Sequence, residues 1–285
     1  MRETRTVVIT GASRGLGLAS ASLLYARGWR VIAAMRSVES GLGNLRSATG
    51  ASAGDPRLIG VSLDLDDSAS IHAAVAAILS ITQAPDVIIL NAGIAAAGSV
   101  EDTPVAAWQK LFSTNLFGPV EFIKALLPSL RTAGRGRIVA VSSMAGIRGM
   151  PVSSIYSASK SAMERWVESL AAEIAPFGLG VTVLVPGTFD TEIITGRSPD
   201  YGIHDGPYSP LYIAMRRAAD PIIAKAASPH YFARKLAKTL EDAAPFVRKT
   251  VGMDALGMSI IARVLPAKWF HKCLCKVLGL PASQR

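Results

Sequence analysis

Short apolar runs alternate with amphipathic stretches through the first two thirds of the chain. The runs are rich in Val and Ile and apolar nearly throughout, which is typical of parallel strands that are covered on both faces. They are predicted as strands at Thr6–Thr10, Arg30–Met35, Arg57–Leu63, Asp86–Leu90, Arg137–Ser142 and Gly180–Pro186. The stretches between them, such as 69–80 and 157–175, show apolar positions at helical spacing. This alternation predicts an α/β fold, a doubly wound Rossmann domain with a mostly parallel sheet.

The alternation ends after the sixth run. Residues 197–212 are rich in Gly, Pro and Tyr and are predicted as a loop. We place this loop within a substrate segment over residues 192–225, which a basic helical extension over residues 226–285 follows. No linker or internal repeat divides the chain, so residues 1–285 are expected to form a single domain.

The last predicted helix, 267–279, has two unlike faces. Lysines recur on one face at positions 268, 272 and 276. The other face is apolar and carries Trp269, Phe270, Cys273, Leu274, Val277 and Leu278. Such a helix can pack on the domain's own core with its lysines in water, which is the commoner arrangement in soluble enzymes. It can also lie in a membrane interface as a peripheral contact, with its lysines toward anionic headgroups.

Composition narrows the class of protein. Half of the 285 residues are hydrophobic and 18% are charged, which suits a compact enzyme and excludes long disordered segments. No apolar run is long enough to span a membrane, and the polar start shows no secretory signal, so a cytoplasmic location is expected. The two cysteines, Cys273 and Cys275, have no second pair to complete a metal site, so no metal is expected.

The net charge of +9 is concentrated in the last quarter of the chain. Residues 211–285 contain 13 Lys and Arg against 4 Asp and Glu, whereas residues 1–210 contain 17 of each. These basic residues are not interleaved with a stacking platform or a known nucleic-acid-binding module. Nucleic acid is therefore not an expected partner.

A glycine-rich turn follows the first predicted strand and precedes a helical run. Its spacing is GxxxGxG, which differs from the common dinucleotide fingerprint GxGxxG. Glycines at such a junction let the backbone approach a pyrophosphate and direct the N–H groups of a helix N-terminus toward it. The residues of this turn expected to contact a cofactor are Gly11, Ser13, Arg14, Gly15, Leu16 and Gly17.

The end of the second predicted strand indicates which nicotinamide cofactor is used. Folds that select NAD usually carry an acidic residue there, which binds the ribose 2′-hydroxyl. This chain has Arg36 instead, and Arg14 lies in the glycine turn nearby. Two guanidinium groups suit a 2′-phosphate, so NADP(H) is favoured over the alternative that both arginines are solvated surface residues.

One helix places Tyr156 and Lys160 four residues apart, and therefore on the same face. The pKa of a free phenol is about 10, and a neighbouring ammonium lowers that pKa by stabilising the phenolate. The pair can thus shuttle a proton, although Tyr-x-x-x-Lys alone is a frequent chance arrangement.

Taken together, these features resemble the short-chain dehydrogenase/reductase family, near its hydroxysteroid and retinol dehydrogenase branch. The matching positions follow the family's order over residues 5–191, namely the turn at 10–17, Asp64 with Leu65, Asn91-Ala92-Gly93, Asn115, Ser143, Tyr156, Lys160, Pro186-Gly187 and Thr191. The resemblance implies a seven-stranded parallel sheet and a nicotinamide-dependent oxidoreductase.

The resemblance also implies a role for each catalytic residue. Tyr156 is the general acid in reduction and the general base in oxidation, and Ser143 hydrogen-bonds the substrate oxygen. Lys160 binds the nicotinamide ribose and lowers the pKa of the tyrosine. Asn115 is expected to hold a water molecule that links Lys160 to solvent.

Other matching positions are expected around the cofactor. The resemblance places Asp64 at the adenine, residues 91–93 along the adenosine ribose, and residues 187–191 over the carboxamide. Leu65 and Pro186 are also expected to bind the cofactor. It also implies a homodimer or homotetramer, in which the helices of Tyr156 and Asn115 meet a partner subunit. The candidate apolar stripe for that contact is Ala162, Trp166 and Leu170.

Apolar and aromatic residues of the substrate segment predict a lipophilic ketone or secondary alcohol, such as a steroid or retinoid, as the substrate. They are Ile193, Ile194, Tyr201, Ile203, Tyr208, Leu211, Tyr212, Ile213 and Met215. Two alternatives stay open. One is a 3-oxoacyl-thioester ketoreductase, whose basic tail faces an acidic carrier or a CoA phosphate. The other is a protein that senses NADP(H) without turnover, which the intact Ser143, Tyr156 and Lys160 disfavour.

Overall fold

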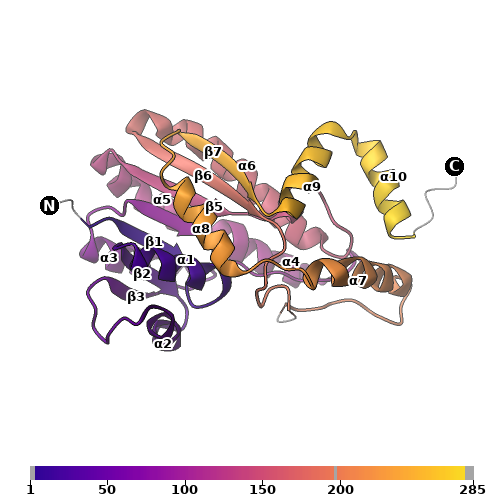
Figure 1. Cartoon of the computed structure of the whole chain (residues 1–285), viewed down its shortest axis with the longest axis horizontal. Helices are drawn as coiled ribbons and strands as arrows, with labels where there is room; N and C mark the ends of the chain where they lie inside the picture. The colour runs from indigo at the N-terminus through magenta and orange to yellow at the C-terminus, as the bar shows by residue number, and fades with distance from the viewer. Residues whose placement is uncertain (1–3, 196–197, 280–285) are drawn as a thin grey trace.

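Seven parallel strands form one continuous sheet in the computed structural model, which describes residues 4–195 and 198–279 (Figure 1). Their order across the sheet is β3-β2-β1-β4-β5-β6-β7. The strands are β1 (Thr6–Thr10), β2 (Arg30–Met35), β3 (Leu58–Ser62), β4 (Val87–Leu90), β5 (Gly136–Val141), β6 (Leu179–Pro186) and β7 (Phe246–Val251). The doubly wound parallel sheet predicted from the alternation is confirmed, and the six predicted strands agree with the observed ones to within a residue at each end.

Helices cover both faces of the sheet, because successive strand residues point to opposite sides. Val8 of β1 packs with one set of helices, α3 (Ser68–Ile81), α5 (Gly118–Ala133) and α6 (Ser154–Ile174). Its neighbour Val7 packs with the other set, α1 (Gly15–Ala26), α2 (Val38–Thr49) and α8 (Pro229–Thr239). Strands buried on both sides have no polar face, which is why they appear in the sequence as unbroken apolar runs.

Two expectations about helices need correction. The substrate segment contains a helix, α7 (Ser209–Ile223), where a loop is predicted up to residue 212; Arg197, the start of that loop, lies outside the described residues. Pro210 fits the first turn of this helix, where no backbone N–H is needed. The apolar stripe predicted for a subunit contact is shortened, since Leu170 is only 5% exposed and Trp166 is partly buried against the core, which leaves Ala162 and Trp166 partly exposed.

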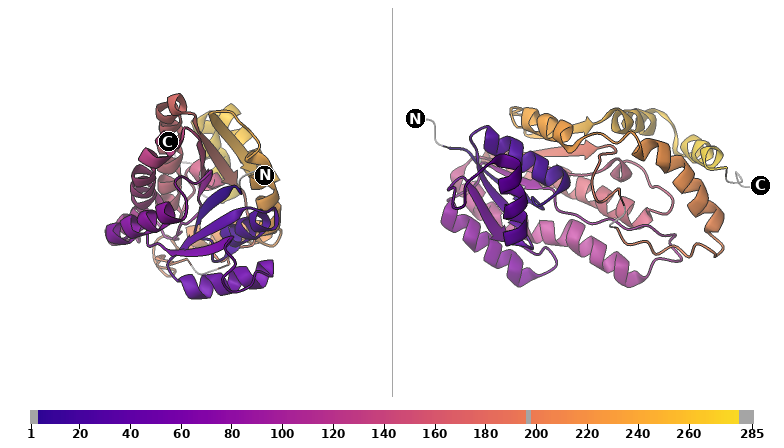
Figure 2. Two further views of the ribbon diagram at one scale, coloured as in Figure 1. Left: turned by 90° about the vertical axis from the view of Figure 1, so that its left-hand side faces the viewer. Right: turned by 60° about the horizontal axis from the view of Figure 1, so that its bottom comes forward.

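The remaining elements gather at one end of the molecule (Figures 1 and 2). The helices α9 (Met253–Val264) and α10 (Ala267–Val277) form a hairpin, and α7 lies at the same end. The segment α4 (Val105–Phe112) leads through a π-helical turn, η1 (Ser113–Phe117), into α5. Among the described residues, no helix is long and apolar enough to cross a bilayer.

Candidate active site

Ser143 and Tyr156 meet beyond the carboxyl end of β5. Ser143 follows that strand in extended backbone, and its Oγ accepts a hydrogen bond from the backbone N–H of Ala145 at 3.2 Å. This contact begins the short helix η2 (Met144–Gly146). Tyr156 lies in the first turn of α6, and its hydroxyl is near enough to the Ser143 side chain for Ser143 to lower its pKa. The two hydroxyls that the sequence predicts as catalytic are therefore within direct reach of each other.

Lys160 lies one turn further along α6 and is 4% exposed. Its Nζ is 5.9 Å from the centre of the Tyr156 ring and donates a hydrogen bond to the backbone oxygen of Val141 at 2.9 Å. Burial lowers the pKa of this lysine to about 8, and the Glu164 carboxylate opposes the shift. Its ammonium is thus held by a strand carbonyl beside the tyrosine.

The phenol of Tyr156 differs from the sequence-based expectation. Burial raises its pKa above the usual value, and the hydrogen bond with Ser143 partly opposes that rise. The lowering of the Tyr156 pKa that the sequence predicts from Lys160 is not found. The physical reason is desolvation, which disfavours the phenolate more than the hydrogen bond with Ser143 favours it.

Asn115 lies in the π-helical turn η1 and is fully buried. Its Oδ1 accepts from the Ile94 N–H at 2.9 Å, and its Nδ2 donates to the Ile94 carbonyl at 2.9 Å and to Ser159 Oγ at 3.1 Å. A Cβ placed on Gly93 would lie 3.2 Å from Asn115 Oδ1 and 3.5 Å from Lys160 Nζ. The amide therefore fixes the backbone beside Lys160, and local π-helical turns of this kind are frequent at functional sites.

The glycine turn is shaped for close approach of a ligand to the backbone. Gly11 and Gly15 have positive φ angles of 68° and 54°, which favour glycine. A Cβ on Gly17 would lie 2.2 Å from the Gly11 carbonyl oxygen and 2.5 Å from Asn91 Nδ2, so a side chain has no room there. Asn91 fixes the backbone of the turn, since its Nδ2 donates to the carbonyls of Thr10 and Gly11 at 3.0 and 3.1 Å. The turn thus packs tightly against Asn91 and leads directly into the N-terminus of α1.

The two arginines predicted to select the cofactor flank this turn. Arg36 directly follows β2 and is exposed. Arg14 is half-exposed, and its Nη1 forms an ion pair with Glu192 at 2.8 Å. No carboxylate occupies the position at the end of β2 that would bind a ribose 2′-hydroxyl.

The remaining predicted cofactor positions line the same edge of the sheet. Asp64, after β3, accepts a backbone hydrogen bond from Asp66, and Leu65 is buried. Beyond β6, the methyl of Thr191 lies 3.3 Å from the position of a Cβ on Gly15. The segment that begins with Pro186 and Gly187 therefore returns to the glycine turn.

Two carboxylates that the sequence reasoning missed support this site. Glu164 is 3% exposed and accepts hydrogen bonds from Ser142 Oγ at 2.6 Å and from Arg248 Nε at 3.0 Å. Asp254, in the first turn of α9, accepts from the Thr188 N–H at 2.6 Å. Glu164 had a sequence signal, because it lies four residues after Lys160, but Arg248 and Thr188 are distant in the chain from the carboxylates they meet.

Tyrosines of the substrate segment are tied to the loop that precedes α4. Tyr212 Oη donates to Asp102 at 2.5 Å and accepts from the Ser99 N–H at 2.7 Å. Tyr208 Oη donates to Glu101 at 2.8 Å. These two rings therefore anchor α7 through their hydroxyls, in addition to any lining role that the sequence predicts.

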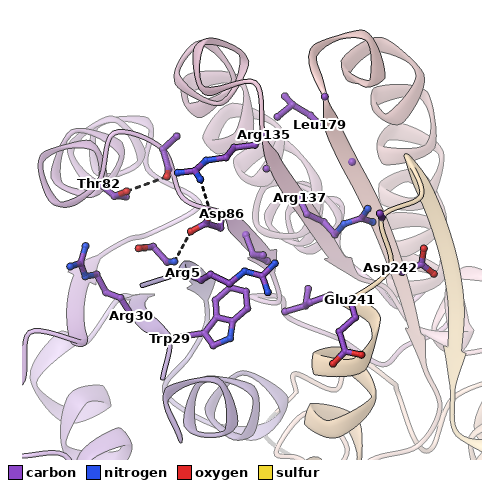
Figure 3. Close-up of a pocket in the computed structure, with 18 of the residues that line it drawn as sticks. Arg5, Trp29, Arg30, Thr82, Asp86, Arg135, Arg137, Leu179, Glu241 and Asp242 are labelled. Atoms are coloured by element: carbon purple, nitrogen blue, oxygen red, sulfur yellow. Dashed lines mark hydrogen bonds and ion pairs between the residues drawn. The ribbon is translucent and has the colours of Figure 1, made fainter. Parts of the chain in front are cut away.

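A cavity of about 1390 Å³ lies at the opposite, amino-terminal ends of the strands (Figure 3). Its arginines are engaged by neighbours: Arg137 donates to Thr182 Oγ1 at 2.7 Å, and Arg5 stacks on Trp29. None of the predicted catalytic residues lines it. The candidate active site is therefore the cluster at the carboxyl ends, where ligands bind in open α/β sheets.

Comparison with known proteins identifies the family of this chain. The family model for short chain dehydrogenases matches residues 5–202. The chain belongs to the short-chain dehydrogenase family.

Curated relatives place the chain within that family. It is 39% identical over 213 residues to dehydrogenase/reductase SDR family member 7B of Xenopus tropicalis, covering 71% of this chain and 68% of that protein. It is 34% identical to 3-ketodihydrosphingosine reductase of Bacteroides thetaiotaomicron, covering 70% and 72%. It is 37% identical to retinol dehydrogenase 8 of Bos taurus, covering 66% of this chain and 60% of that protein. The predicted proximity to the retinol dehydrogenase branch is confirmed.

Solved structures share the fold over most of the chain. A short-chain dehydrogenase from Streptomyces avermitilis has a TM-score of 0.79 and 31% identity, covering 91% of this chain and 92% of that one. Actinorhodin polyketide ketoreductase, solved with NADPH, has a TM-score of 0.73 and 25% identity, covering 89% and 98%. The expected nicotinamide-binding oxidoreductase fold is thus confirmed.

Proposed function

We propose that this protein is an NADP(H)-dependent carbonyl reductase or secondary alcohol dehydrogenase that acts on a lipophilic compound such as a steroid or retinoid. The observation that carries the proposal is the proximity of the Ser143 and Tyr156 side chains to each other and to the buried Lys160. All three lie at the same edge of the sheet as the glycine turn.

The chain's own residues carry out the proton chemistry. A bound nicotinamide supplies or accepts the hydride at the reacting carbon. In reduction, the Tyr156 hydroxyl gives its proton to the carbonyl oxygen as charge develops there, while the Ser143 hydroxyl donates a hydrogen bond to the same oxygen. In oxidation, Tyr156 receives the proton of the alcohol. The ammonium of Lys160 stabilises the phenolate that reduction leaves behind.

The residues of the glycine turn fit the cofactor. Gly11 and Gly15, with their positive φ angles, and Gly17, which has no room for a side chain, let the backbone turn tightly into α1. A pyrophosphate can approach the backbone N–H groups at the start of that helix, where the helix dipole favours negative charge. Arg36 and Arg14 offer guanidinium groups to a 2′-phosphate, and the ion pair of Arg14 with Glu192 is exposed enough to exchange partners. We therefore favour NADP(H) over NAD(H).

A lipophilic substrate is supported by two observations. Ile193, Ile194, Ile203 and Ile213 of the substrate segment are exposed. Two relatives have names that state lipophilic substrates, a ketosphingoid base and retinol. Reduction of an acyl thioester is the second candidate, because the basic last quarter suits an acidic carrier and a solved structure with this fold is a polyketide ketoreductase.

One experiment tests the reaction class, the cofactor and the substrate together. Loss of NADPH absorbance is followed with steroid, retinoid, acyl-thioester and small ketones, and NADH is run in parallel. We expect turnover with a lipophilic ketone and a clear preference for NADPH, which Arg36→Asp shifts toward NADH. Turnover with the thioester alone would favour the second candidate, and equal use of NADH by the wild type would contradict the role of the arginines.

We also propose a homodimer or homotetramer, as the family resemblance implies. The contact cannot use Leu170, which is buried in the subunit's own core. Phe117 is the last residue of η1, directly before α5, and its large ring is exposed. It is our candidate contact. Light scattering at micromolar concentration is expected to give a multiple of the monomer mass, and Phe117→Lys is expected to lower it.

A further inference from the structure

The helix α9 carries an apolar stripe that nothing in the described chain covers. Met253, Leu256, Ile260, Ile261 and Val264 recur along one face, and all five are exposed, Met253 to 80%. Ala255 is the helix's one fully buried residue. Seven of the 17 large exposed apolar side chains of the described residues fall within the 25 residues from 253 to 277. Concentration of this kind marks an interaction surface.

The helix α10 divides its apolar residues between two sides. Phe270, Leu274, Cys275 and Leu278 are partly or fully buried. On the other side Trp269 and Val277 are exposed, together with Cys273. The single apolar face predicted from the sequence is therefore split, and only half of it packs on the protein. The exposed half adjoins the lysines, with Lys272 Nζ 5.2 Å from the Trp269 ring.

Charge identifies what covers this surface. The chain contains no acidic residue after Asp254, whose carboxylate is already bonded to the Thr188 and Ala255 N–H groups. The described residues beyond it carry Arg263, Lys268, Lys272 and Lys276. A symmetric contact between two copies would bring cations onto cations without a carboxylate between them. An anionic lipid surface, in contrast, complements both the lysines and the apolar stripe.

The hairpin is fixed to the catalytic loop. Arg148, five residues after Ser143, donates through Nη2 to the carbonyl oxygens of Ala262 at 2.8 Å and Leu265 at 3.4 Å. Its guanidinium also lies 5.2 Å from the centre of the Phe270 ring. Asp254 ties the other end of α9 to the segment after β6. A surface that holds the hairpin therefore also orients the active site relative to it.

We propose that the α9–α10 hairpin docks on membranes that contain anionic lipids. The exposed side chains of Met253, Ile260, Val264, Trp269 and Val277 enter the boundary between headgroups and acyl chains. The lysines of α10 lie at the lipid phosphates. The proposal goes beyond the proposed reaction and does not depend on it, because docking requires no turnover.

The test is flotation of the full chain with vesicles of phosphatidylcholine, alone or mixed with phosphatidylserine. We expect binding to the mixed vesicles that high salt weakens. Val264→Glu is expected to reduce it roughly tenfold or more, because an apolar side chain is replaced by a charge that anionic lipids repel. Val105→Glu is the matched control, because Val105 is 72% exposed and Val264 is 76% exposed. This control is expected to float like the wild type.

A second variant tests the electrostatic part. Lys272→Glu with Lys276→Glu is expected to abolish the preference for phosphatidylserine. Circular dichroism and thermal melting check that each variant is folded. The proposal is overturned if the wild type does not bind the mixed vesicles, or if Val264→Glu and Val105→Glu bind alike. It is also overturned if Val264→Glu lowers the oligomer mass in the absence of lipid, since a second copy would then cover the stripe.

Discussion

The catalytic region and the C-terminal hairpin use apolar residues in opposite ways. Between β1 and the segment after β6, apolar side chains fill both faces of the sheet, and polar groups such as Asn115 and Lys160 are buried with hydrogen-bond partners. In α9 and α10 the large apolar side chains are mostly exposed, and basic residues surround them. Apolar residues thus form a closed core around the site in one region and an open surface in the other.

The largest effect on activity is expected from the removal of a single hydroxyl group in the catalytic region. Tyr156→Phe keeps the ring beside Lys160 but removes the hydroxyl that bonds to Ser143. We expect kcat to fall at least ~100-fold, as is usual when a general acid is lost, with little change in cofactor affinity. Steady-state kinetics and a cofactor titration measure the two quantities. A Phe variant with near-normal kcat would remove Tyr156 from the mechanism.

The buried Lys160 predicts a pH dependence of the protein's stability. The pKa of Lys160 is about 8 in the folded protein against 10.5 as the ordinary value, so between these values the unfolded chain holds a proton that the folded chain has released. The free energy of unfolding contributed by this group therefore rises with pH across that window.

Relative to Lys160→Met, the wild type should gain about 2 kcal/mol between about pH 7 and about pH 10. Urea denaturation at both pH values measures this difference, from which pH-independent effects of the substitution cancel. Identical pH profiles for wild type and Lys160→Met would show that Lys160 is not desolvated.

Glycine positions test how tightly the backbone of the site is packed. Gly17→Ala places a Cβ 2.2 Å from the Gly11 carbonyl oxygen, so the turn must shift. We expect a loss of stability of about 1–3 kcal/mol and weaker cofactor binding. Gly43→Ala, in α2, meets nothing within 4 Å and should be neutral or stabilising. Thermal melting and cofactor titration of both variants distinguish a crowded turn from a general intolerance of alanine.

The smallest effects separate the two regions most directly. Val183 in β6 is 1% exposed, and Val183→Ala removes two of its methyl groups from the core. We expect this substitution to lower the free energy of unfolding by about 2 kcal/mol. Val264→Ala removes the same two methyl groups from an exposed position and should change the free energy of unfolding by less than about 0.5 kcal/mol. Denaturation curves measure both. Equal costs would mean that the stripe on α9 is covered in solution.

The sequence predicted the first six strands well because each is buried on both faces, so its apolar run begins and ends with the strand itself. The edge strand β7 was missed as a range, since Arg248 and Lys249 interrupt its apolar pattern. The start of α7 was missed because its Gly, Pro and Tyr neighbours are typical of loops. Both errors fall where side chains face water or a distant segment, and there the periodicity weakens.

Sequence spacing alone determined the glycine turn, the Tyr156 and Lys160 pair and the order of the motifs, because these depend on backbone geometry within a few residues. Only the tertiary structure decided which groups surround them. Glu164 meets Arg248 across 84 positions, and Arg148 meets the end of α9 across 114. It also decided that half of the apolar face of α10 is buried and half exposed, because burial depends on what lies opposite a residue and the local pattern does not contain that information.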